Sequence, residues 1–133
     1  MEVKSTSDFR HQLTKINKKK KQYACIETQI KSLFSNNSFA QIVQMNYFLR
    51  DVGEFKLLKI RLPNPTMQKG RSGGYRLITL LNTQLETTTL LYIYPKVGKL
   101  KKDNITDDEE MKFLKHYFKE LDNKELEVFK LTK

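Results

Sequence analysis

Positively charged side chains recur around one glycine-rich stretch of this 133-residue chain, "KGRSGGYRLITLL", residues 69–81. Lys69, Arg71 and Arg76 flank two adjacent glycines there, and glycine lets a phosphate group approach the main chain closely. Further cations precede and follow the stretch: Lys59, Arg61, Lys96, Lys99, Lys101 and Lys102. If the segments that carry them are neighbours in one sheet, these side chains meet on its face or rim and form a site for a polyanion.

A cluster of cations can bind RNA, and it can also cleave it. RNA carries its own nucleophile, so cleavage needs only that the 2′-hydroxyl lose a proton, the phosphate charge be stabilised and the leaving oxygen be protonated. Neighbouring cations lower the pKa of a lysine, which can then act as base or acid, whereas arginine stays charged and grips phosphate with paired donors. The spacing alone is compatible with cleavage and with simple nucleic-acid binding.

Other kinds of catalytic site find little support. His11 and His116 are far apart in sequence, and the acids at 107–110 are typical of a helix start rather than of a metal site. Ser72 lacks a nucleophile-elbow motif, and the glycine-rich stretch lacks the spacing of a phosphate-binding P-loop. We therefore expect no metal and no small-molecule cofactor.

Composition and charge indicate which ligands and which cellular compartment suit this chain. The formal charge of +10 predicts attraction to polyanions. The single cysteine, Cys25, excludes an internal disulfide and fits a reducing compartment. No apolar run approaches the roughly 18 residues of a membrane span, and no secretion signal is evident. We expect a cytoplasmic protein that does not bind membranes.

Three strands are predicted to position the cations. In residues 54–63 the side chains alternate from Leu58 onward, with apolar residues on one face and Lys59 and Arg61 on the other. Residues 74–82 and 86–96 are rich in β-branched and aromatic residues and are expected to form an antiparallel hairpin.

The other elements are read from periodicity and capping residues. Residues 23–28 predict a first strand, and Ser38 with Gln41 predicts a capped helix that continues to Gly53. A second helix is expected over 106–121, with a core stripe of Met111, Leu114, Phe118 and Leu121. The final residues, 123–133, could be a short strand or a helical tail.

We therefore expect two regions: a basic arm over 1–21, either mobile or a frayed extra helix, and an α+β domain over 22–133. The domain should hold a small, mainly antiparallel sheet with helices on one side and the cations on its open face. "KINKKKK" within the arm either grips phosphate or only keeps the chain in solution.

At this point the motifs resemble a known family. "LLKIRLPNPTMQKGRSGGYRLITLL", "LLYIYPK" and "NITDDEEMKFL", in this order, are similar to the RelE superfamily of bacterial toxins, and specifically to its HigB-like branch. "CIETQIKSLFSNNSFAQIVQMNYFL" resembles the first strand and helix of that branch. The resemblance covers about residues 23–121.

The resemblance implies a RelE-like fold and a ribosome-dependent endoribonuclease that cuts messenger RNA and is neutralised by a cognate antitoxin. By position, Arg76 matches an arginine that stabilises phosphate, and Arg71, Lys69 and Lys96 match other catalytic cations. The residues expected to hold RNA or the ribosome are Lys59, Arg61, Lys99, Lys101 and Lys102.

Two other functions stay open at this stage. ParE-like gyrase inhibitors share the superfamily fold without the RNA-cleaving residues, although the dense cations at 69–76 favour cleavage. A non-catalytic RNA- or DNA-binding domain would need the charge alone.

Overall fold

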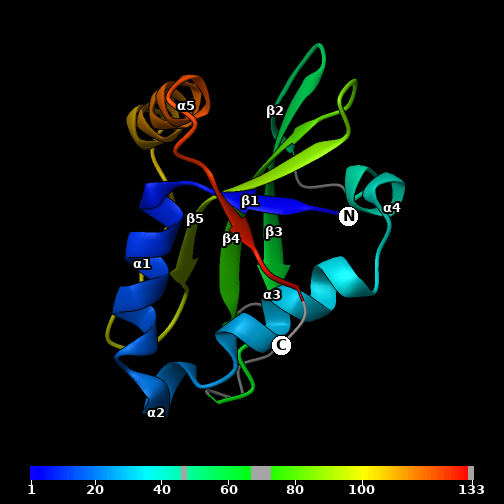
Figure 1. Cartoon of the computed structure of the whole chain (residues 1–133). Coiled ribbons are helices and arrows are strands. Elements are labelled where there is room, and N and C mark those ends of the chain that lie inside the picture. Colours follow the sequence, from blue (N-terminus) through cyan, green and yellow to red (C-terminus); the bar gives the residue numbers. More distant parts are fainter. Residues whose placement is uncertain (46–47, 67–72, 132–133) are drawn as a thin grey trace.

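The computed structural model describes residues 1–45, 48–66 and 73–131. Within these ranges the chain is an α+β fold in which helices surround a six-stranded sheet (Figure 1). Its elements are β1 (Val3–Ser5), α1 (Ser7–Asn17), α2 (Lys20–Tyr23), α3 (Ile26–Ser35), α4 (Phe39–Val43), β2 (Phe48–Val52), β3 (Phe55–Leu62), β4 (Tyr75–Asn82), β5 (Thr87–Pro95), α5 (Asp107–Asp122) and β6 (Glu127–Phe129). No helix in the described ranges is both long enough and apolar enough to cross a membrane.

The strands lie in the order β2-β3-β4-β5-β1-β6. β1 runs parallel to β5, and the other neighbouring strands are antiparallel. The sheet is therefore mixed, and the expectation of a mainly antiparallel sheet is corrected, because residues read as an arm supply β1. The predicted strand that carries Lys59 and Arg61 is confirmed as β3, and the predicted hairpin is confirmed as β4 and β5.

Both faces of the sheet are covered by helices, so the expectation of helices on one side only is wrong. Leu58 and Ile60 of β3 join the core formed with α1, α3 and α4. Leu57 of β3 and Ile78 of β4 point to the other face, where they pack with Phe113 of α5. Because β3 and β4 carry apolar residues on both faces, each face needs a cover.

Of the two alternatives for the basic arm over 1–21, the structure has a helix, α1, but one that is packed on the sheet rather than frayed. Phe9, Leu13 and Ile16 have the spacing of one helical face, and Phe9 and Ile16 are fully buried against the sheet. Thr6 caps α1 by accepting a hydrogen bond from the amide of Phe9. This apolar stripe is narrow, and the surrounding lysines hide it in the sequence.

The predicted strand over 23–28 is also wrong. Tyr23 ends α2, and α3 begins at Ile26. Ile26, Ile30 and Phe34 are buried at a helical spacing of four, so the apolar pattern extends well beyond the short run that favoured a strand.

The predicted helix after Ser38 is shorter than expected. The capping box of Ser38 and Gln41 is confirmed, but α4 ends at Val43 and the chain re-enters the sheet as β2. Gly53 has a φ of +60°, the left-handed conformation expected for it, but it turns the β2–β3 hairpin rather than ending a helix.

Helix α5 begins and ends within one residue of the predicted bounds, 106–121, and has the predicted capping box, but it buries a different face. Phe113 and Tyr117 contact the sheet, whereas Met111, Phe118 and Leu121 of the predicted stripe are 57, 44 and 45% exposed. The sheet side also carries two acids whose charge is satisfied. Glu110 accepts from Arg50 Nε at 3.0 Å, and Glu120 from the Ser7 amide at 2.7 Å. The sequence left residues 123–133 as either a short strand or a helical tail, and the structure has the strand β6 there.

Candidate functional site

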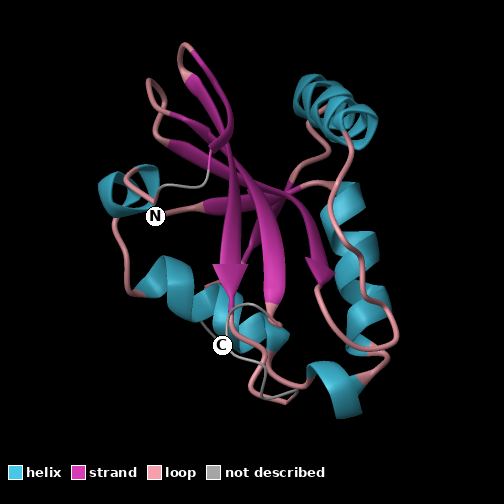
Figure 2. Cartoon of the chain, turned by 180° about the vertical axis from the view of Figure 1, so that it is seen from behind, coloured by secondary structure: helices cyan, strands magenta, loops and turns pink. Residues whose placement is uncertain are grey.

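Three polar side chains form a row across the middle strands of the sheet. Arg61 of β3 lies opposite Arg76 of β4, and Arg76 lies opposite Tyr94 of β5. Residues directly opposite each other in antiparallel strands point to the same face. In Figure 2, which shows the molecule from behind, no helix lies in front of the lower parts of β3 and β4. The row is therefore not covered by a helix, although Arg76 and Tyr94 within it are buried.

Lys96 joins this row from the loop that follows β5. Its amide donates to the carbonyl of Gly74, and its ammonium donates to the carbonyl of Asp103 and lies 6.0 Å from the centre of the Tyr94 ring. Burial and the positive charges of Arg76, Lys59 and Arg61 lower the pKa of Lys96 and outweigh the opposing effect of Asp103. The four residues Lys59, Arg61, Arg76 and Lys96 thus form one cation cluster.

Arg76 is the most enclosed member of the cation cluster, with only 6% of its surface exposed. Its Nη1 donates to the carbonyl of Tyr75 at 3.2 Å. Keeping a guanidinium charged at such a site is costly, and further positive charges beside it add to that cost. An anion bound here would reduce both the desolvation and the repulsion.

Tyr94 is a polar group of the site that is not among the predicted site residues. Its ring is fully buried, and its hydroxyl has no hydrogen-bond partner among the described residues. Burial raises the pKa of Tyr94, although the charge of Arg76 opposes this, so the hydroxyl keeps its proton at neutral pH. The signal that could have identified Tyr94 is its position opposite Arg76, and a β-bulge determines that position.

The loop between β5 and α5 borders the cation cluster. Lys59 Nζ lies 3.4 Å from Asn104 Oδ1, so Asn104 is a second residue that sequence reasoning missed. Lys102, predicted to bind RNA, instead forms an ion pair of 2.9 Å with Glu109. Burial raises the pKa of Glu109, but hydrogen bonds from Lys102 and from Thr106 outweigh it and lower the pKa overall. The charge of Lys102 is thus already balanced.

Other predicted residues lie elsewhere. Lys99 and Lys101 are exposed on the same loop, and the amide of Lys99 contacts Gln22 of α2 rather than the cation cluster. Lys69 and Arg71 lie outside the described residues. Four of the predicted cations are therefore brought together, and two are placed on a neighbouring surface.

Gly74 has a structural role in the glycine-rich stretch. A Cβ atom there would overlap the carbonyl oxygen of Leu62 on the neighbouring strand. Gly74 therefore allows β3 and β4 to lie close together where they carry Arg61 and Arg76. We expected the glycines to admit a polyanion to the main chain, whereas Gly74 admits another strand.

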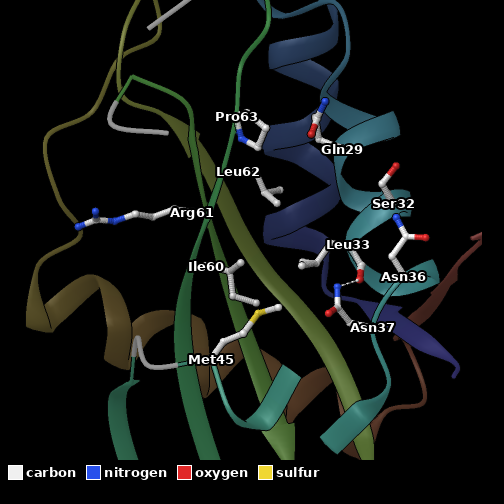
Figure 3. A pocket seen from close by; sticks show the side chains of 10 residues that line it. All are labelled: Gln29, Ser32, Leu33, Asn36, Asn37, Met45, Ile60, Arg61, Leu62 and Pro63. Carbon is white, nitrogen blue, oxygen red and sulfur yellow. Dashed lines mark hydrogen bonds between the residues drawn. The ribbon is translucent and has the colours of Figure 1, made fainter. Parts of the chain in front are cut away.

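A pocket of about 510 Å³ lies on the other side of β3, facing α3. In Figure 3, the polar lining residues Gln29, Ser32 and Asn36 belong to α3 and its C-terminal end, whereas Arg61 points away from the other lining residues. The pocket and the cation cluster therefore lie on different faces of the sheet. Arg61 borders the pocket but directs its charge to the cation cluster.

Within the described ranges, no group of three or more His, Cys, Asp or Glu side chains is arranged to hold a metal ion. His116 Nδ1 lies 2.7 Å from Asp8 Oδ2, which joins α5 to α1. The cations of the site are suited to two kinds of chemistry: charge stabilisation by two arginines, and proton transfer by a lysine of lowered pKa. Comparisons with protein-family models, with curated proteins and with solved structures find no match to this chain.

Proposed function

We propose that this chain is the toxin of a type II toxin–antitoxin system, with a RelE-like fold. Its activity is the cleavage of translated messenger RNA on the ribosome, by attack of the 2′-hydroxyl and without a metal ion. The order of the sequence motifs supports the family, and the cation cluster supports the chemistry.

One observation carries this proposal: Lys96 lies beside Tyr94, the residue opposite Arg76, and burial together with the positive charges of Arg76, Lys59 and Arg61 lowers its pKa. A protein that only attracts RNA through its surface gains from lysines that stay charged. Proton transfer instead needs a lysine whose pKa lies nearer to neutral pH. Crowding cations around one lysine serves the second purpose.

The proposed reaction assigns a role to each residue. Lys96 takes the proton of the 2′-hydroxyl, the 2′-oxygen forms a bond to phosphorus, and the bond from phosphorus to the 5′-oxygen breaks. Arg76, with Arg71, stabilises the charge that develops on the phosphate. Lys69 returns a proton to the leaving 5′-oxygen. The products are a 2′,3′-cyclic phosphate and a 5′-hydroxyl, while Lys59 and Arg61 position the RNA backbone.

The proposed partners follow from the family and from the charge. A cognate antitoxin would hold the toxin inactive, and with a net charge of +10 on the toxin we expect an acidic surface on the antitoxin. The ribosome and its bound messenger are the target, so the activity would take place in the cytoplasm.

The test is controlled expression in a bacterium with and without the antitoxin, with the 5′ ends of messages mapped as growth stops. We expect new ends inside translated codons and, for Arg76→Ala, at least about a hundredfold less cleavage. Lys115→Ala, on the exposed side of α5, is the matched control and should cleave normally. Intact messages with damaged DNA would point instead to a gyrase inhibitor.

A second function, RNA binding without catalysis, is favoured by one contact. The Lys96 ammonium donates to the Asp103 carbonyl, and the Asp103 charge favours the protonated lysine. If binding alone is the function, RNA is retained by the purified protein but stays intact in its presence, and Arg76→Ala weakens binding only modestly.

A further inference from the structure

The lysine segment, residues 18–21, is held at the same end of the sheet as the cation cluster. Figure 1 shows α2, which contains part of it, at the lower end of the molecule, where β3 and β4 also meet their loops. Tyr23 Oη donates to the carbonyl of Val97 at 2.8 Å and accepts from the Leu100 amide at 3.1 Å. Val97 follows Lys96 directly, so the lysine segment is attached to the loop that carries the catalytic lysine.

Further contacts fix α2 in this position. Gln22 Oε1 accepts from the Lys99 amide at 2.7 Å, and the Gln22 carbonyl accepts from Asn64 Nδ2 at 3.0 Å. Gly98 has a φ of +85° and packs directly under Tyr23, where a Cβ would overlap the hydroxyl. The lysines are therefore presented by a docked turn of helix rather than by a loose arm.

The charge of the lysine segment is not balanced by neighbours. Lys18, Lys20 and Lys21 are exposed, Lys19 is half-buried, and none of the four forms an ion pair with the described residues. Between Asp8 and Glu27 the sequence has no acid. Lys99 and Lys101 add two exposed cations on the adjoining loop.

We propose that the lysine segment, together with Lys99 and Lys101, binds the phosphates of the same single-stranded RNA that the cation cluster cleaves, a few nucleotides away from the cleaved bond. This inference rests on the proposed function for the identity of the strand. A membrane surface is a poor ligand, because Tyr23, the large apolar residue of α2, is buried and leaves no side chain to insert.

The expected size of the effect follows from counterion release. Each phosphate neutralised on a single strand contributes about 0.7 to the slope of log affinity against log salt, so four lysines contribute up to about 3. When the salt concentration rises from about 50 to about 200 mM, the native protein should lose affinity for a long RNA. That loss should be larger, by a factor of up to about 50, than the loss for a protein without the lysine segment.

The test measures binding of fluorescent, 2′-O-methylated RNA, which cannot be cleaved, by anisotropy at several salt concentrations. One RNA has about four nucleotides and the other about twenty, to fill the cation cluster alone or both surfaces. The variant K18Q/K19Q/K20Q/K21Q is compared with K112Q/K115Q/K119Q/K124Q, which removes four exposed charges from α5 and the residues after it. A second variant with arginine at 18–21 keeps the charge.

We expect the first glutamine variant to lose at least about tenfold in affinity for the long RNA, with a shallower salt slope and normal binding of the short RNA. The control and the arginine variant should bind both RNAs like the native protein. An equal loss in the α5 variant, an equal loss with the short RNA, or no loss at all would overturn the inference. Because this RNA resists cleavage, a protein that proves to have no nuclease activity would refute the proposed function without changing this result.

Discussion

Replacing Gly74 with alanine tests whether the cation cluster depends on the close approach of β3 and β4. A Cβ atom at residue 74 would lie 1.8 Å from the Leu62 carbonyl oxygen and 3.0 Å from Cα of Pro63. Both are main-chain atoms, so no side-chain rotation relieves the overlap. An ordinary contact begins at 3.4 Å, so the strands must separate locally by 3.4 − 1.8 = 1.6 Å, and the close-packed interior resists this.

The cost can be built from two parts. Overpacking of this kind costs about 1–3 kcal/mol. The Lys96 amide donates to the Gly74 carbonyl at 2.9 Å, and losing that hydrogen bond adds about 1 kcal/mol. We therefore expect Gly74→Ala to lower the free energy of unfolding by about 2–4 kcal/mol. Arg61 and Arg76 lie beside the overlap, so cleavage should fall by about a hundredfold.

Urea unfolding, followed by circular dichroism, and the RNA cleavage rate are the two readouts. Gly53→Ala is the matched control, because Gly53 has a φ of +60° but nothing lies within 4 Å of an added Cβ. Only the backbone penalty of about 1 kcal/mol should appear there, with normal cleavage. A Gly74→Ala protein with native stability and native cleavage would refute the reasoning.

Two further predictions concern the loop after β5. If neutral Lys96 is the base, cleavage should rise about tenfold per pH unit until the pH reaches its lowered pKa, and Lys96→Gln should remove this slope; a profile that is the same in both proteins would contradict the role. Gly98→Ala should displace α2, because a Cβ would overlap the hydroxyl of the buried Tyr23 and lie 3.0 Å from Cζ of its ring. We expect the free energy of unfolding, measured in urea, to fall by about 2 kcal/mol. Binding of long RNA should weaken while binding of short RNA stays normal, and an equal loss for both RNAs would contradict this prediction.

The central strands and their cations were predictable because their signals are local. Alternation placed Lys59 and Arg61 on one face of a strand, and the run of β-branched residues with a turn signal gave the hairpin that carries Arg76. The capping box of Thr106 and Glu109 fixed the start of α5. Patterns within one element therefore located most of the cation cluster.

Tyr94 could not be placed from the sequence, because a β-bulge sets its face. From the pair Asn82 and Thr87, counting six residues along each strand would put Arg76 opposite Ile93. The pairing shifts by one residue between Ile78 and Thr79, so Arg76 lies opposite Tyr94 instead. A shift of one residue exchanges the faces of a strand, and nothing local in the sequence announces it.

The N-terminal helices were missed for a different reason. Lysines dominate residues 15–21, so the few apolar residues of α1 give a weak helical signal. The helix is stabilised by packing on β5 rather than by local preference. The buried face of α5 was misjudged because Glu110 and Glu120 find partners on other elements. Partners that are distant in sequence decided both cases.

The most direct test of the central claim is the chemistry of the cut. Purified protein is added to translating ribosomes that hold a message with a normal ribose or a 2′-O-methyl ribose at the cleaved nucleotide. The proposed mechanism predicts a 2′,3′-cyclic phosphate and a 5′-hydroxyl from the normal message, and no cleavage of the methylated one. Cleavage of the methylated message, or a 5′-phosphate at the cut, would contradict attack by the 2′-hydroxyl.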